Sequence, residues 1–240
     1  MKGQISNFIE FERYDIVDTS FDRIVEPIVT SVINNTQLLP YLCECILHFN
    51  SYEKYSRREG NVTSFEKWQE RLKCIFQSEF VDDFISKLKR LYEEGKDDHK
   101  KLSRLRGRVL ELLIFHFVYK RYNAPGYIIL QGCGVKINGR LIATEERKTV
   151  DIAAWNGIFG EFYETKVGPD LFDEKVIKYL GLLAVKLQEV NIKAIVACVT
   201  MASVERLERQ MQKFNWIEGS KFLRCVGREN LLTICNNSSL

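Results

Sequence analysis

The sequence predicts an α+β protein, in which an N-terminal helical region is followed by a mixed sheet flanked by helices. Apolar residues recur at three- and four-residue steps in the first part of the chain, as in Ile24, Ile28 and Val32. Two Asn-Gly dipeptides, at 138–139 and 156–157, each join short apolar runs, which is typical of tight β-hairpins. The opening helices and the later hairpins therefore predict separate helical and sheet-containing parts.

Bulk properties describe an ordinary globular protein. The 240 residues are 45% hydrophobic and 28% charged, and this length suits one large or two small domains. The net charge of +3 permits binding to a polyanion without arguing for it. Seven scattered cysteines suit free thiols in a reducing compartment, and no stretch approaches the roughly 20 apolar residues that span a bilayer. We therefore expect a cytoplasmic protein without a membrane partner.

The first hundred residues are predicted to form a helical domain or arm. Helical spacing covers 21–35, 38–49, 63–76 and 81–91, with Pro40 in the first turn of the second helix and a loop over 51–61. The polar run 93–101 is predicted to be the boundary, which gives a helical domain at 1–100 and a second domain at 101–240. The helical part carries no evident chemistry, and a homodimer or protein partner could use it.

The second domain is predicted to begin with a buried helix over 103–122, capped by Ser103, with Glu111 among its apolar residues. A buried carboxylate needs a partner, so Glu111 either pairs with Arg108 or faces a metal. The elements expected after this helix are strands at 127–137 and 140–144, a charged connection at 145–148, a hairpin over 150–167, a helix at 172–190, a strand at 192–200, a helix at 204–214 and one or two strands within 222–235.

The hairpin gathers polar residues on one face. If its turn is centred on Asn156 and Gly157, Asp151 lies opposite Phe162. Because side chains alternate along a strand, Asp151, Glu164 and Lys166 then share one face, while Glu161 points to the other.

This gathering has two interpretations. The first is a structural ion pair of Lys166 with Asp151 or Glu164. The second is a site for a hard divalent cation, with the two carboxylates as ligands and Lys166 beside the reacting atom.

Asp151, followed on the next strand by Glu164-Thr165-Lys166, resembles the PD-(D/E)xK superfamily of restriction-endonuclease-like nucleases. Its core is a helix carrying a Glu, an antiparallel meander carrying the Asp and the Glu-x-Lys, then a helix and a strand, and this order agrees with residues 103–200. Val150 stands where the family's name has a proline. The resemblance implies a restriction-endonuclease-like core with Glu111 as the helical Glu.

The resemblance also implies a chemistry. Mg²⁺, for which Mn²⁺ could substitute, would be held by Asp151 and Glu164, with a backbone carbonyl near Thr165 and Glu111 through a water molecule. Lys166, with a lowered pKa, would orient or deprotonate the attacking water. The expected activity is hydrolysis of phosphodiester bonds in nucleic acid, with DNA as the favoured substrate and endonuclease or exonuclease action left open.

Substrate binding would need basic surface. Two groups of basic residues could contact phosphates, one around the start of the Glu111 helix and one near the sheet edge: Lys87, Lys89, Arg90, Lys96, Lys100, Lys101, Arg104, Arg106 and Arg108, and Arg140, Arg147 and Lys148. The alternatives are a catalytically silent nucleic-acid-binding or scaffolding subunit with the same fold, or an interaction module with a buried ion network.

Overall fold

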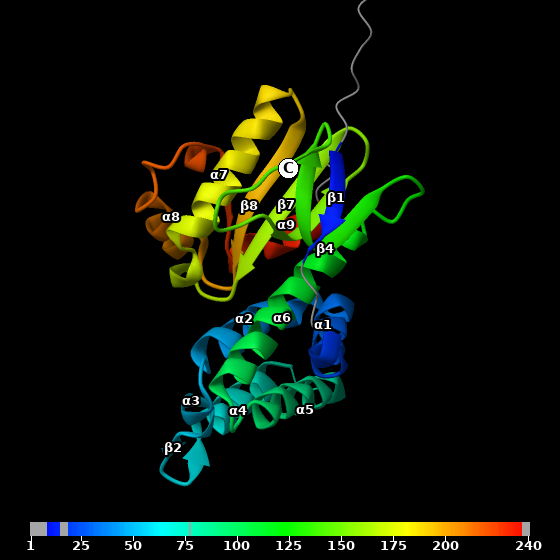
Figure 1. Ribbon diagram of the computed structural model, residues 1–240. Coiled ribbons are helices and arrows are strands. Elements are labelled where there is room, and N and C mark those ends of the chain that lie inside the picture. The colour runs from blue at the N-terminus through cyan, green and yellow to red at the C-terminus, as the bar shows by residue number, and fades with distance from the viewer. Residues whose placement is uncertain (1–8, 15–18, 77, 237–240) are drawn as a thin grey trace, which may run out of the picture. The chain divides into compact units, whose positions relative to one another are not determined.

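A computed structural model describes residues 9–14, 19–76 and 78–236. The chain forms two compact units (Figure 1). One is helical and ends at Leu113, and the other contains the first strand and the chain from Ile114 onward. The second unit holds a seven-stranded mixed sheet flanked by helices, so the predicted α+β class is confirmed.

The helical unit buries the apolar stripes that the sequence indicates, for example Val25 and Ile28 against the helix that carries Leu88. The predicted loop at 51–61 instead contains a short helix and part of a two-stranded hairpin. The elements are α1 (Asp22–Asn34), α2 (Leu39–His48), α3 (Tyr52–Ser56), β2 (Arg58–Glu59), β3 (Val62–Thr63), α4 (Ser64–Phe76), α5 (Glu79–Glu94) and the first part of α6 (His99–Tyr119). Pro40 lies in the first turn of α2, as predicted.

The predicted boundary at 100/101 is wrong. Asp98 Oδ1 accepts hydrogen bonds from the backbone N–H of Lys100 (2.8 Å) and Lys101 (3.0 Å), so Asp98, and not Ser103, caps α6. The polar run 93–101 thus contains the end of α5, a turn over 95–98 and the start of α6, all within one unit. Arg106, which donates to the Ile46 carbonyl, further ties the start of α6 to α2, and the division between units falls inside α6.

The sheet has the order β1-β4-β6-β7-β8-β9, with β5 paired to β4. Its strands are β1 (Ile9–Arg13), β4 (Ile128–Ile137), β5 (Arg140–Leu141), β6 (Val150–Trp155), β7 (Phe159–Lys166), β8 (Lys193–Thr200) and β9 (Arg224–Val226). β1 pairs with β4, so an N-terminal segment assigned by sequence to the helical domain belongs to the sheet. The run 192–200 is a strand parallel to β7, as its continuous apolar character suggested.

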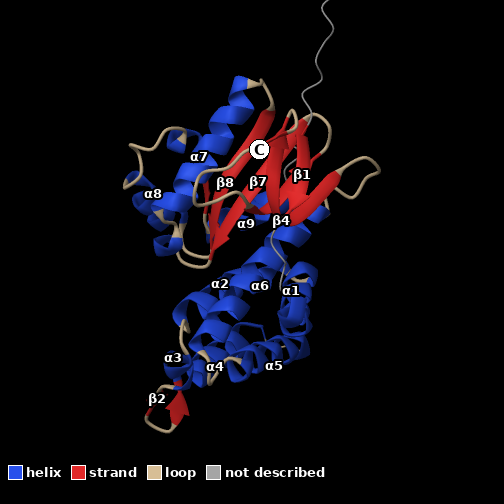
Figure 2. Ribbon diagram, viewed as in Figure 1, coloured by secondary structure: helices blue, strands red, loops and turns tan. Residues whose placement is uncertain are grey.

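Helices cover both faces of the sheet (Figure 2). α7 (Glu174–Glu189) and α8 (Val204–Gln212) bury Leu180, Leu183 and Leu207 against one face, beside Phe162 of β7. The end of the described chain forms β9 and then α9 (Leu231–Asn236), so only the first part of 222–235 is a strand. 3-10 helices occur at Thr19–Phe21, Thr36–Leu38, Pro169–Leu171, Ser220–Phe222 and Arg228–Asn230. None of the described helices is long and apolar enough to cross a membrane.

The two predicted hairpin turns differ. Asn138 and Gly139 both have positive φ angles (52° and 76°), as the Asn-Gly signal requires. In the second turn only Gly157 has a positive φ angle (91°). The Oδ1 atom of Asn156 accepts hydrogen bonds from the N–H groups of Ile158 and Phe159. The turn is therefore centred one residue later than predicted.

This shift moves the register of β6 and β7 by two residues. Trp155 pairs with Gly160, and Ile152 with Tyr163. Because a shift of two keeps every side chain on its own face, the predicted sharing of faces survives the wrong register.

Gly181 of α7 allows a close backbone contact. A Cβ atom there would lie 2.4 Å from the carbonyl oxygen of Glu218. We expect Gly181→Ala to destabilise the protein by about 1–3 kcal/mol, because neither backbone can yield without repacking. Urea unfolding measures this. Gly107→Ala in α6 is the matched control, since a Cβ there meets no atom within 4 Å, and it should be neutral or stabilising. Equal effects of the two substitutions would contradict the contact.

Candidate functional site

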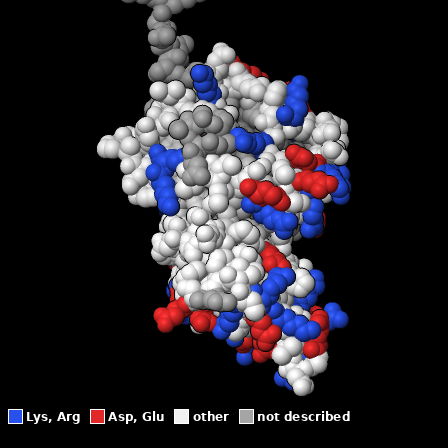
Figure 3. Space-filling view, turned by 180° about the vertical axis from the view of Figure 1, so that it is seen from behind, with Lys and Arg blue, Asp and Glu red and all other residues white. Residues whose placement is uncertain are grey.

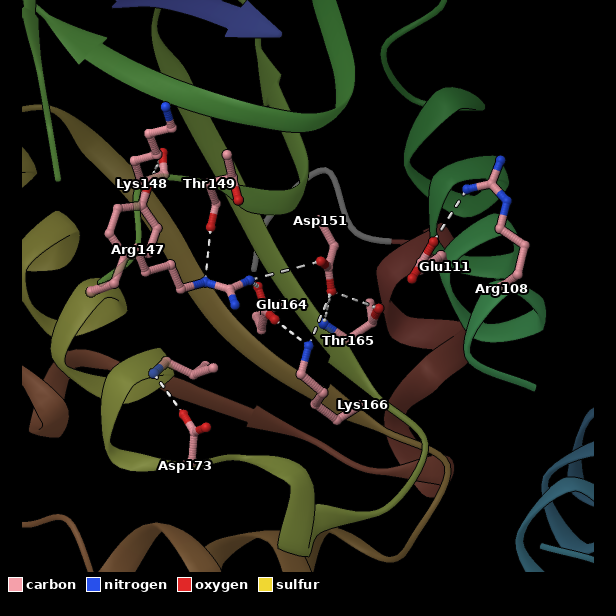
Figure 4. Close-up of polar contacts among 12 residues, drawn as sticks. Arg108, Glu111, Arg147, Lys148, Thr149, Asp151, Glu164, Thr165, Lys166 and Asp173 are labelled. Carbon is pink, nitrogen blue, oxygen red and sulfur yellow. Dashed lines mark hydrogen bonds and ion pairs between the residues drawn. The ribbon is translucent and has the colours of Figure 1, made fainter. Parts of the chain in front are cut away.

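Asp151 lies where β6 and β7 part. The last backbone pair of this ladder is Ile152 with Tyr163. Beyond it, Asp151 Oδ2 accepts hydrogen bonds from the Thr165 N–H (2.7 Å) and the Thr165 hydroxyl (2.9 Å). A side-chain carboxylate thus bridges the two strands and is fixed in orientation (Figure 4).

Glu164 is fully buried, and its two oxygens have different partners. Oε1 pairs with the Lys166 amine on the same strand, and Oε2 lies 2.5 Å from Nη2 of Arg147. Lys166 Nζ is also 3.9 Å from Asp151 Oδ2. The predicted gathering of Asp151, Glu164 and Lys166 on one face is therefore confirmed, while their chemical roles stay predictions.

Arg147 is the site residue that the sequence did not assign to the site. Its Nη2 lies 3.9 Å from Asp151 Oδ1, and its Nε donates to the carbonyl of Thr149 (3.1 Å). A turn holds its backbone, because Thr144 N–H donates to the Arg147 carbonyl and Arg147 N–H donates to the Thr144 hydroxyl. The sequence placed Arg147 in a charged connection and among the basic residues that could contact phosphates. The structure instead pairs its guanidinium with the buried Glu164, and the position of an arginine four residues before Asp151 did not show which way that side chain points.

The electrostatics of the site follow from the burial of Glu164. Burial, assisted by the nearby Asp151, raises the pKa of Glu164 to about 7, although Lys166 and Arg147 oppose the rise. Burial lowers the pKa of Lys166, but Glu164 and Asp151 outweigh it, so that pKa is raised. The lowered pKa expected from the sequence is thus wrong for this arrangement, because two carboxylates lie beside the amine.

The donor set suits a hard cation in part. Carboxylate oxygens of Asp151 and Glu164 are the ligand type that Mg²⁺ prefers. Thr165 contributes its N–H and hydroxyl, which orient Asp151. Within the described ranges, no group of three or more His, Cys, Asp and Glu side chains is arranged to hold a metal. The residues therefore fit an ion held by two carboxylates that also keeps water and substrate ligands.

Glu111 belongs to the helical unit. There it pairs with Arg108 at 3.2 Å, and Arg108 also binds Asp22 through two nitrogens at 2.8 and 3.0 Å. The pairing with Arg108 is the alternative that the sequence left open. A role of Glu111 beside the metal stays a prediction.

The opposite face of β7 carries a second polar cluster. Glu161 is 1% exposed, and both its oxygens pair with the guanidinium of Arg121. The hydroxyls of Tyr122 (3.1 Å) and Tyr163 (2.5 Å) also donate to it. The sequence placed Glu161 on the correct face but gave no sign of these partners, which come from outside the hairpin or from its own strand.

The basic residues do not all remain at the surface. Arg106 and Arg108 are buried and paired inside the helical unit, so they are corrections to the predicted set of phosphate contacts. Lys87 and Lys101 lie within 4 Å of Asp83 and Glu94. On the face of this unit seen in Figure 3, basic and acidic side chains are interspersed. In the sheet unit, Lys148 Nζ lies 3.9 Å from the centre of the Tyr14 ring.

Comparison with known proteins adds little. No family model matches the sequence, and no curated protein matches it. Among solved structures, the protein VC1899 from Vibrio cholerae is similar at 15% identity and a TM-score of 0.42 over 95% of this chain. The match covers 57% of that protein, so the chain spans little more than half its length.

The buried cluster around Glu161 makes a prediction about stability. Glu161→Ala should destabilise the protein by about 3–5 kcal/mol, because it leaves the half-buried Arg121 guanidinium and the buried Tyr122 and Tyr163 hydroxyls without their carboxylate. Glu205→Ala, which removes an exposed partner of Arg209, should cost about 0.5 kcal/mol or less. Urea unfolding compares the two, and a Glu161→Ala variant as stable as Glu205→Ala would refute the cluster.

Proposed function

We propose that the chain is a metal-dependent nuclease of the PD-(D/E)xK type. The observation that carries the proposal is the convergence of Asp151, Glu164 and Lys166 where β6 and β7 part. The element order supports it, since α6, the antiparallel strands β4, β6 and β7, α7 and the parallel strand β8 follow one another as in the core of that superfamily. We also propose that the protein is cytoplasmic, because that compartment would keep its cysteine thiols reduced.

Each residue of the site has a task in this proposal. Asp151 and Glu164 hold Mg²⁺ or Mn²⁺, and Thr165 keeps Asp151 in position. When bound, the cation would acidify a water molecule and neutralise charge on the scissile phosphate of DNA or another nucleic acid. Lys166 would orient the water and offset negative charge as the phosphodiester bond breaks.

A second candidate function has its own observation. Both oxygens of Glu164 already have cationic partners, and the charges of Asp151, Glu164, Arg147 and Lys166 cancel. A buried ion network of this kind can hold a fold together without chemistry. It favours a catalytically silent nucleic-acid-binding or scaffolding subunit.

The first prediction separates catalysis from binding. Lys166→Met keeps most of the side-chain volume and removes the charge, so it should abolish Mg²⁺-dependent cleavage of duplex DNA, single-stranded DNA or RNA while the protein stays folded. Lys193→Met, an exposed lysine at the start of β8, should leave cleavage unchanged. Gel assays with Mg²⁺, Mn²⁺ or EDTA measure this. Cleavage by Lys166→Met at the wild-type rate would eliminate the proposed mechanism.

The second prediction concerns the metal itself. Mg²⁺ at 100 times its dissociation constant should stabilise the native chain by about 2.7 kcal/mol, because it binds only the folded site. Asp151→Asn should lose most of that increment, since one ligand becomes neutral. Thermal unfolding with and without Mg²⁺ measures both proteins. If the charged residues form only an ion network, Mg²⁺ should stabilise neither the wild type nor Asp151→Asn.

A further inference from the structure

One nitrogen of Arg147 stands between the two carboxylates of the site. Nη2 is 2.5 Å from Glu164 Oε2 and 3.9 Å from Asp151 Oδ1. The other oxygens are engaged elsewhere, since Glu164 Oε1 pairs with Lys166 and Asp151 Oδ2 accepts from Thr165. Arg147 Nη2 therefore bonds one of the two carboxylates that would hold the cation and lies near the other.

We propose that Arg147 is the resident cation of the site and exchanges with the divalent metal at Glu164 Oε2. This inference rests on the proposed function. A divalent ion and a guanidinium at the same carboxylate oxygen would place like charges within a few ångströms of each other, which is strongly unfavourable in a buried site. Binding of the ion therefore requires Nη2 to leave.

The fully buried Glu164 explains why a resident cation is needed. An ionised carboxylate without water costs several kcal/mol unless cations or hydrogen-bond donors compensate it. Lys166 compensates one oxygen and Arg147 the other. Arg147 thus occupies the second oxygen of the buried carboxylate before the metal binds.

The anchoring of Arg147 suits an exchange. Its Nε donates to the Thr149 carbonyl, and its backbone is held by the turn from Thr144. Its side chain is 23% exposed, in contrast to the fully buried Glu164. Rotation of the guanidinium toward solvent would therefore break side-chain contacts, including the Nε bond to Thr149, while the turn continues to hold the backbone.

The experiment is calorimetric titration of the full chain with Mn²⁺ and with Mg²⁺, without nucleic acid. If Arg147 competes with the metal, Arg147→Gln should bind about tenfold more tightly or better than wild type, although the metal-free variant melts at a lower temperature. Arg147→Lys, which keeps the charge, should bind within a few-fold of wild type. Arg224→Gln, at an exposed position at the start of β9, is the control and should match wild type.

Weaker or unchanged affinity in Arg147→Gln would overturn the inference, because Arg147 would then only orient Glu164 for the metal. The proposed function is tested separately by the wild-type titration, and absence of metal binding there would overturn both. If Arg147→Gln does not fold, nitrogen NMR of the wild-type guanidinium replaces it. Saturating Mg²⁺ should release the restricted rotation of Nη2, and a signal that does not change would again overturn the exchange.

Discussion

The burial of the Glu164 carboxylate is the constraint on which the rest of the site depends. β7 lies between β6 and β8, and Glu164 on it is fully buried, so this carboxylate cannot reach water and must find compensation inside the protein. Lys166 supplies part of that compensation from the same strand. The remainder comes from Arg147, and the turn that begins at Thr144 fixes where this arginine can reach.

β7 carries a buried carboxylate on each of its two faces, and each carboxylate has its own compensating partners. Glu161 is enclosed by Arg121 and the tyrosine hydroxyls, all of which donate hydrogen bonds to it. Glu164 instead shares its cations with Asp151, whose side chain is 21% exposed. A carboxylate surrounded by donors explains structure, whereas a pair of carboxylates in which Asp151 reaches solvent offers a cation and a substrate phosphate a way in. Because side chains alternate along β7, the structural carboxylate Glu161 and the candidate functional carboxylate Glu164 lie on opposite faces.

The sequence predicts what depends on local pattern and misses what depends on distant partners. Side-chain alternation placed Asp151, Glu164 and Lys166 on one face even though the turn was off by one residue and the register by two. The helical spacing likewise identified α7. Neither pattern could show that β1 joins the sheet, that α6 is shared by two units, or that Arg147 turns toward Glu164, because these outcomes are fixed by pairing across long stretches of chain.

The two interpretations of the hairpin charges need not exclude one another. An ion network and a metal site require the same two carboxylates, and they differ in which cation sits at Glu164 Oε2. In the proposed exchange, the network is the form of the site without metal. Burying Glu164 without any cation would cost several kcal/mol, and the total stability of a protein is only about 5–15 kcal/mol. The metal-free network therefore stabilises a protein that must fold before it binds its metal. The cancellation of charges that favours a silent scaffold is therefore also what a metal site on a buried strand needs in order to fold.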